Sequence, residues 1–190
     1  MTARITKQAL ARARCGRLIL TLVLGAASCS KASGTTAAPT PASAAPVAEA
    51  LPATPEGVLT GYENIRRLLA EDQITAVSAF AKRLTTAARE VVRAKSTPEL
   101  PVFERIAAAS ATLESTDAKD PDAVRRQFGE VSRGVVELLV ANESLRASRH
   151  VFDCPMAQGY RKWVQLTPAI HNPYMGAKML ECGAASTWAP

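Results

Sequence analysis

The sequence predicts an all-α protein: an up-down four-helix bundle with a C-terminal, Cys/Met-rich segment of irregular and short-helix structure packed on it. Two observations support this prediction. In residues 55–149 apolar side chains recur at helical spacing in four stretches, which are separated by helix-starting residues. Residues 150–190 lack this pattern and are rich in sulfur and aromatic rings. Short connections between helices of this length favour antiparallel neighbours, and hence an up-down bundle.

The N-terminus has the features of an export signal. Its first residues hold five basic side chains and no acid, and the apolar run Leu18–Leu24 is shorter than the roughly 20 residues of a membrane-spanning helix. The tetrapeptide Ala26-Ala27-Ser28-Cys29 resembles the bacterial lipobox, which predicts a lipoprotein signal peptide over residues 1–28 and lipidation of Cys29. A plain cleaved signal or an uncleaved anchor stays open, because Ala26 stands where leucine is most common.

The residues after Cys29 predict where the protein resides. Ser30 in this position is typical of lipoproteins sent to the outer membrane, so we expect a lipid anchor on the periplasmic side of that membrane. A plain signal would instead give a soluble periplasmic or secreted protein. Residues 29–54 are almost entirely Ala, Pro, Ser, Thr and Gly after the cysteine, and such a composition predicts a disordered tether.

The net charge of the chain depends on the fate of this leader. Of the 23 Lys and Arg residues, five precede Cys29, which leaves 18 against 17 Asp and Glu and lowers the formal charge from +6 to +1. No basic excess then remains to replace the counterions of a phosphate backbone. We therefore expect no nucleic-acid partner.

The helical domain is expected over residues 55–190, with the bundle in 55–149. Thr54, Thr97 and Asp120 each precede a proline and are expected to cap a helix, and Asp72 is expected to cap the remaining one. The expected core residues are Val58, Tyr62, Ile65 and Leu69; Ile74, Val77, Ala81, Leu84, Ala88 and Val91; Phe103, Ile106, Ala109 and Leu113; and Val124, Phe128, Val131, Val135 and Leu138.

The bundle carries no recognisable catalytic motif. It has no Glu-x-x-His pair for a di-iron site and no Cys-x-x-Cys-His for covalent haem, and its charges fall between the apolar positions. No nucleophile, base and orienting group recur together in the chain. We therefore expect that the protein is not an enzyme.

Residues 150–190 are the candidate functional segment. They hold five of the nine aromatic residues, three of the four methionines and both histidines. Cys15 leaves with the leader and Cys29 carries lipid, so Cys154 and Cys182 are the two cysteines that remain. The compartment beyond the inner membrane permits disulfides.

A soft-metal site is one interpretation of this segment. Asn172-Pro173 can start a short helix, on which Met175, Met179 and Cys182 would share one face at spacings of four and three. If Cys154 and Met156 fold against that face, thiols and thioethers converge, with His171 in reserve. Such ligands select Cu(I) or Ag(I) over Zn²⁺, Mg²⁺ or Ca²⁺.

A disulfide is the alternative interpretation. A bridge between Cys154 and Cys182 would close a loop of 28 residues and contribute roughly 3 to 4 kcal/mol in the chain-entropy picture. The methionines would then pack as ordinary apolar side chains. The two states can also alternate, because reduction frees the thiolates that a metal needs.

Four motifs in this segment resemble the signature of a known family. They are Cys-Pro-Met-Ala from Cys154, Trp-Val-Gln from Trp163, Ile-His-Asn-Pro-Tyr-Met-Gly from Ile170 and Met-Leu-Glu-Cys-Gly from Met179. Together they are similar to a bacterial domain family of unknown function, found in exported proteins and at the C-terminus of periplasmic adaptor subunits of copper and silver efflux pumps of the resistance-nodulation-division type. The resemblance implies a link to heavy-metal efflux, and an envelope protein such as an efflux adaptor as partner.

Two functions follow as hypotheses. The first is binding or transfer of Cu(I) or Ag(I) in the periplasm by the set Cys154, Met156, Met175, Met179 and Cys182. The second is a disulfide-stapled, non-enzymatic module that docks on an envelope or efflux assembly.

Overall fold

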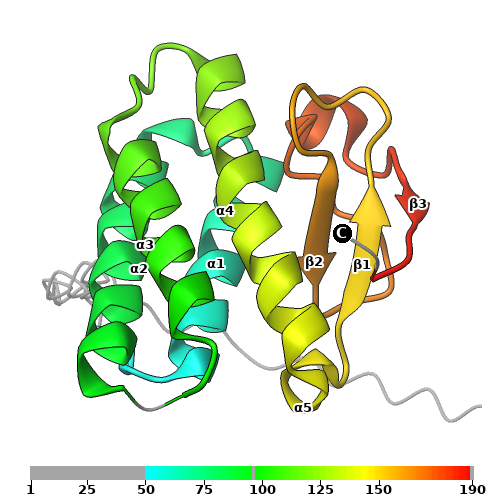
Figure 1. The fold of residues 1–190 in the computed structure, drawn as a ribbon. Helices are drawn as coiled ribbons and strands as arrows, with labels where there is room; N and C mark the ends of the chain where they lie inside the picture. The colour runs from blue at the N-terminus through cyan, green and yellow to red at the C-terminus, as the bar shows by residue number, and fades with distance from the viewer. Residues whose placement is uncertain (1–49, 96, 189–190) are drawn as a thin grey trace, which may run out of the picture. The chain divides into compact units, whose positions relative to one another are not determined.

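The structure is mostly helical, with a small three-stranded sheet near the C-terminus (Figure 1). It is a computed structural model that describes residues 50–95 and 97–188, all within one compact unit. The predicted leader, Cys29 and the tether up to residue 49 lie outside the described residues. Within them, no helix combines the length and apolar character needed to cross a membrane.

Two of the four predicted helix starts are confirmed. The Thr54 hydroxyl accepts a hydrogen bond from the Gly57 N–H (3.1 Å), and the Asp120 carboxylate accepts one from the Ala123 N–H (2.9 Å). The five helices are α1 (Pro55–Ala70), α2 (Ile74–Ala94), α3 (Leu100–Ser115), α4 (Pro121–Ala141) and the short α5 (Glu143–Arg146).

The other two predicted starts are wrong. Asp72 does not cap α2, because its backbone is left-handed (φ 57°) and its carboxylate binds Arg125 and the Ala177 N–H instead. Thr97 does not cap α3 either: its hydroxyl bonds the Glu99 carboxylate, and the helix begins at Leu100 with no side-chain cap.

The apolar stripes form the core as predicted. α1 packs against α2 and α4, and α3 packs against the same two helices. All the expected core residues are buried except Ala109, which is partly exposed. Leu51, which the sequence assigns to the tether, also packs against this core.

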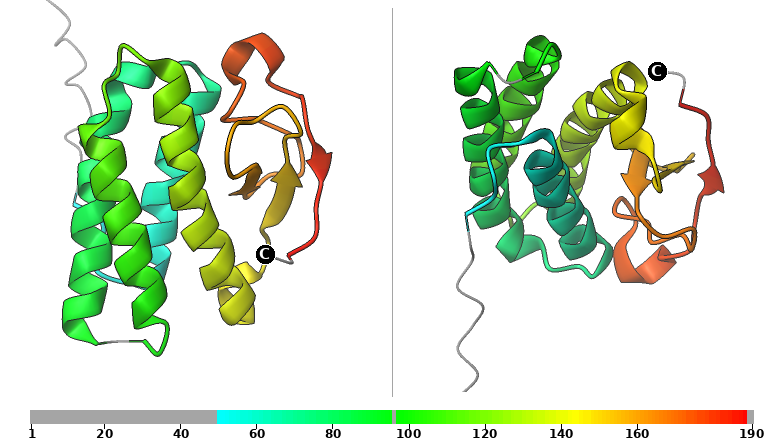
Figure 2. Two further views of the ribbon diagram at one scale, coloured as in Figure 1. Left: turned by 45° about the horizontal axis from the view of Figure 1, so that its top comes forward. Right: turned by 90° about the horizontal axis from the view of Figure 1, so that it is seen from below.

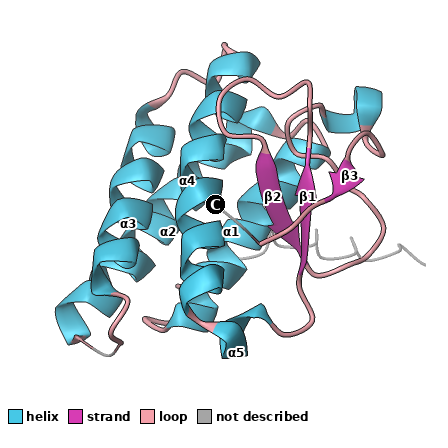
Figure 3. Ribbon diagram, turned by 45° about the vertical axis from the view of Figure 1, so that its right-hand side comes forward, coloured by secondary structure: helices cyan, strands magenta, loops and turns pink. Residues whose placement is uncertain are grey.

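The prediction of an all-α fold is wrong for the C-terminal segment, which contains a sheet. Its strands are β1 (His150–Asp153), β2 (Lys162–Gln165) and β3 (Ala184–Ala185), all antiparallel in the order β2-β1-β3. The expected short helix is reduced to a 3₁₀ turn, η1 (Gly176–Met179). The sheet lies against α4, on the side away from α3 (Figures 2 and 3). Strands of two to four residues are too short for an alternating pattern to identify.

A chain of buried hydrogen bonds joins the helices to the sheet. The Tyr62 oxygen of α1 accepts from the Val164 N–H of β2 (3.0 Å) and pairs with the Ser132 hydroxyl of α4 (2.8 Å). Ser132 in turn donates to the Lys162 carbonyl (2.8 Å), so Tyr62 must donate to Ser132. The Tyr174 hydroxyl donates to the same Lys162 carbonyl (2.7 Å). Burial raises the pKa of Tyr62, which keeps the hydroxyl protonated as a donor.

Aromatic rings follow the same path from α1 to β1. Tyr62 stacks on Phe128 (5.3 Å between centroids), and Phe128 contacts Tyr174 (5.8 Å). Tyr174 and Trp163 pack in a T-shaped arrangement (6.0 Å between centroids), and Trp163 stacks on Phe152 of β1 (5.4 Å). The sheet therefore shares one continuous core with the helices.

Removing the Tyr62 hydroxyl tests this connection. We expect Tyr62→Phe to lower the free energy of unfolding by about 1 to 3 kcal/mol, because the Val164 N–H and the Ser132 hydroxyl each lose a buried partner. Urea unfolding measures the change. Tyr160→Phe is the matched control: the Tyr160 hydroxyl has no hydrogen bond within the described residues, so we expect a change within about 0.5 kcal/mol. Equal effects of the two variants would contradict the structural role of Tyr62.

Candidate functional site

The pairing of β1 with β3 brings together the two segments that carry the cysteines. Asp153 pairs with Ala184, so the next position along β1, Cys154, lies beside Gly183, and Cys182 is one residue further. A Cβ on Gly183 would lie 3.1 Å from the Asp153 carbonyl oxygen, which shows how closely the two segments approach here. The segments that carry Cys154 and Cys182, 28 positions apart in the sequence, thus lie side by side, with Cys182 offset by one residue from the position opposite Cys154.

The two cysteines are free thiols with different exposure. Cys154 is fully buried, and its N–H donates to the Arg161 carbonyl (3.1 Å), which extends the β1–β2 pairing by one residue. Cys182 is half-buried, and its N–H donates to the Met179 carbonyl (3.0 Å). Of the two thiols, Cys182 is therefore the one that solvent reaches.

A tight turn after β1 places Met156 at the surface. The Ala157 N–H donates to the Cys154 carbonyl (3.1 Å), and Met156, within that turn, is 59% exposed. Met156 and Met175 line a common hollow of about 120 Å³, which is also lined by Asp122, Arg125 and Arg126 of α4. Two of the three predicted thioether ligands thus border one space.

The buried side chain of Asn172 organises the loop that carries the other sulfur atoms. Its Oδ1 accepts from the N–H groups of Tyr174 (2.8 Å) and Met175 (3.2 Å), and its Nδ2 donates to the Cys182 carbonyl (2.6 Å). Its backbone N–H donates to the Leu180 carbonyl (2.7 Å). Asn172 thereby closes residues 172–182 into a compact loop.

Arg125 of α4 fastens this loop to the helices. Its guanidinium donates to the carbonyls of Leu69 at the end of α1 (3.2 Å) and of Pro173 (3.2 Å), and it forms an ion pair with Asp72. The other Asp72 oxygen accepts from the Ala177 N–H at the start of η1 (3.0 Å). The loop is held by charge-assisted hydrogen bonds from Arg125 of α4 and to Asp72 of the connection between α1 and α2.

The expected sulfur-bearing helix face is not formed. Only Gly176–Met179 is helical, as a 3₁₀ turn with three residues per turn, so Met175, Met179 and Cys182 do not share one α-helical face. Gly176 has a positive φ (62°), and a side chain there would collide with the Asp72 carboxylate. This conformation interrupts the helix that the Asn-Pro start predicts.

The predicted ligands are thus brought together in part. Met175 packs partly against the core and Met179 is half-buried in η1, while His171 is exposed and uses its backbone to bind Arg66 and Gln165. Among the described residues, no three His, Cys, Asp or Glu side chains converge on a point that could hold a metal ion. A third side-chain ligand to a metal bound by the two cysteines would therefore be a thioether sulfur.

Sequence reasoning missed the residues that hold the site in place. Asn172 was expected only to start a helix and Asp72 only to cap one, whereas both bind the 172–182 loop. Arg125 gave no signal, because its partners lie 48 to 56 residues away in the chain.

Comparisons with known proteins identify no relative: no family profile, no curated protein and no solved structure matches the chain. The resemblance to the efflux-associated family therefore stays a prediction.

The two cysteines should differ in reactivity. We expect iodoacetamide to modify Cys182 in the folded protein at least about tenfold faster than Cys154, because a buried thiol reacts only after local opening. Peptide mass spectrometry measures the two rates. In urea the rates should become similar, which serves as the control, and equal rates in the folded protein would contradict the burial of Cys154.

Proposed function

We propose that the protein is an exported lipoprotein that binds or transfers a soft metal ion, Cu(I) or Ag(I), in the periplasm, in connection with heavy-metal efflux or homeostasis. One observation supports the proposal: the pairing of β1 with β3 places the segments that carry the free cysteines Cys154 and Cys182 side by side. Met156 follows the first by two residues and Met179 precedes the second by three.

The chemistry of these side chains suits a monovalent soft ion. Thiolates and thioethers favour Cu(I) and Ag(I), which accept low coordination numbers and bind oxygen weakly. Cys182 is the accessible thiol and is proposed to receive the ion first, with Cys154 as the buried second ligand. Binding requires deprotonated thiols, so it should release protons and weaken at low pH.

The same pair of cysteines supports a second candidate function. A disulfide between Cys154 and Cys182 would staple the loop 154–182, and its formation requires the Cys182 side chain to turn to the same side of the sheet as Cys154. The protein would then act as a docking module for an envelope partner such as an efflux adaptor. The exposed side chain of Met156 is available for such a contact.

Further features belong to the same proposal. The protein is proposed to be non-enzymatic and to be anchored through Cys29 on the periplasmic side of the outer membrane. The four long helices are proposed to form an up-down bundle, which is supported by the packing of α1 and α3 against α2 and α4 and by the short connections 71–73, 95–99 and 116–120.

Metal titration tests the leading function. We expect the reduced protein to bind about one equivalent of Ag(I) or Cu(I), measured by isothermal calorimetry for Ag(I) and by a competing chelator for Cu(I). Cys182→Ser should weaken binding by about tenfold or more, because it removes a thiolate ligand. The double variant Met156→Ala, Met179→Ala tests the thioethers. His150→Ala, at an exposed position outside the candidate ligand set, is the control and should bind as the unchanged protein does.

The oxidised protein separates the two candidates. No stoichiometric uptake in either redox state would refute metal binding. Uptake by the reduced form alone supports the cysteines as ligands. Equal uptake by the oxidised form, lost in the double methionine variant, would assign the site to the thioethers alone. If the oxidised protein contains the Cys154–Cys182 disulfide and neither the oxidised nor the reduced protein binds metal, the docking module is supported.

Lipidation is tested by a separate pair of variants. We expect the protein expressed in a Gram-negative host to incorporate a palmitate analogue and to sediment with membranes, and Cys29→Ser to lose both properties. Cys15→Ser, in the predicted leader, is the matched control and should keep them. Labelling of the Cys29→Ser variant would contradict the assignment of Cys29.

A further inference from the structure

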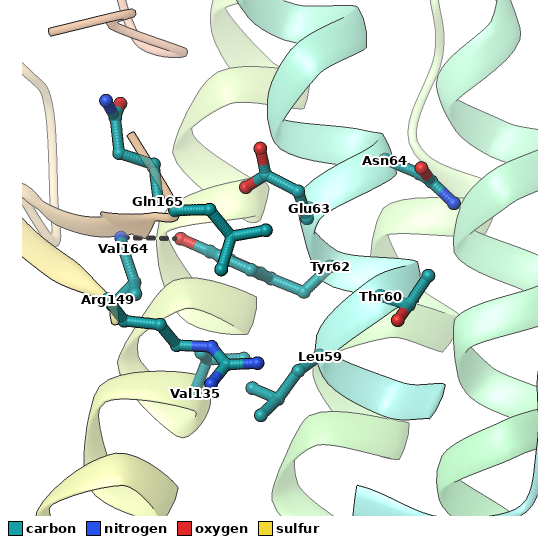
Figure 4. A pocket seen from close by; sticks show the side chains of 10 residues that line it. Leu59, Thr60, Tyr62, Glu63, Asn64, Val135, Arg149, Val164 and Gln165 are labelled. Atoms are coloured by element: carbon teal, nitrogen blue, oxygen red, sulfur yellow. Dashed lines mark hydrogen bonds between the residues drawn. The ribbon is translucent and has the colours of Figure 1, made fainter. Parts of the chain in front are cut away.

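A second hollow lies where α1, α4 and β2 meet (Figure 4), and it shares no residue with the Cys/Met set. Its volume is about 100 Å³, and its apolar wall includes Leu59 of α1, Val135 of α4 and Val164 of β2. Leu166, 52% exposed, lies at its edge. An apolar cavity of about 150 Å³ accepts benzene, so this space has room for about four carbon atoms.

One cation faces this hollow. Figure 4 shows the Arg149 guanidinium extending toward Leu59 and Val135. Its Nη1 donates to the Leu145 and Ala147 carbonyls, whereas its Nη2 and Nε have no hydrogen-bond partner within residues 50–95 and 97–188. In the same part of the chain no carboxylate lies within ion-pair distance of it. Burial lowers the pKa of Arg149, yet an arginine keeps its charge at neutral pH.

Neither of the two carboxylates near Arg149 forms an ion pair with its guanidinium. Glu63 lines the hollow, but both of its oxygens are taken by Arg66 (2.7 and 2.8 Å). Glu56, on the first turn of α1, is exposed and acts on Arg149 only through its longer-range charge. A half-buried cation with free donors beside an apolar space is complementary to an anion that carries a short hydrocarbon chain.

We infer that this hollow binds a small aliphatic carboxylate, with its hydrocarbon chain between Leu59, Val135 and Val164 and its carboxylate on the free donors of Arg149. Two sources supply this chemistry: a free short-chain acid, or the C-terminal residue of a peptide. The inference is independent of the proposed metal site, because neither the cysteines nor the methionines take part.

Binding of isovalerate to the ¹⁵N-labelled protein tests the inference by NMR. We expect saturable shifts confined to the amides around Leu59, Val135 and Val164. Isovaleramide, which has the same shape without the charge, should bind at least about tenfold more weakly, and so should isovalerate to Arg149→Gln. Arg146→Gln is the matched control, because Arg146 pairs with Glu143 and does not line the hollow.

Two further measurements separate a loss of binding from a folding defect of the Arg149 variant and distinguish a free acid from a peptide C-terminus as the ligand. Glu56→Gln leaves the core intact and should strengthen binding two- to threefold by removing a competing charge. N-acetylvaline, which mimics a peptide C-terminus, should bind as well as isovalerate if the ligand is a peptide, and more weakly if it is a free acid. The inference is overturned if neither acid binds, if the amide binds equally, or if Glu56→Gln weakens binding.

Discussion

The Tyr62 hydroxyl is the contact through which the helices and the sheet are fixed relative to each other. It accepts from β2 and donates to Ser132 of α4, which in turn donates back to β2. These groups are buried, so each lost bond leaves an unpaired polar atom with a desolvation cost. The network therefore fixes the position of β2 on α4, and with it β1, β3 and the cysteines at their junction.

Sequence reasoning predicts the helical part of the fold well, for a physical reason. Helices of 16 to 21 residues repeat their apolar face several times, so the stripes of α1 to α4 are legible in the sequence. Caps at Thr54 and Asp120 are local interactions and are predicted correctly. Asp72 fails as a cap because distant groups, Arg125 and the Ala177 N–H, take its carboxylate.

Sequence reasoning singles out the side chains of the candidate site but does not predict their arrangement. Composition alone singles out the sulfur-bearing side chains of residues 150–190. Their arrangement depends on long-range strand pairing and on Asn172, whose hydrogen bonds hold residues 172–182 in a loop instead of an α-helix. The hollow beside Arg149 gives no sequence signal, because its walls come from α1, α4 and β2.

X-ray absorption spectroscopy of the Cu(I)-loaded protein is the most direct measurement of the central claim, that sulfur atoms around the β1–β3 junction bind a soft ion. The account predicts a first shell of sulfur alone, which changes when Cys182 is replaced by serine. A shell dominated by nitrogen or oxygen, or a sulfur shell that is identical in the Cys182→Ser variant, would contradict it.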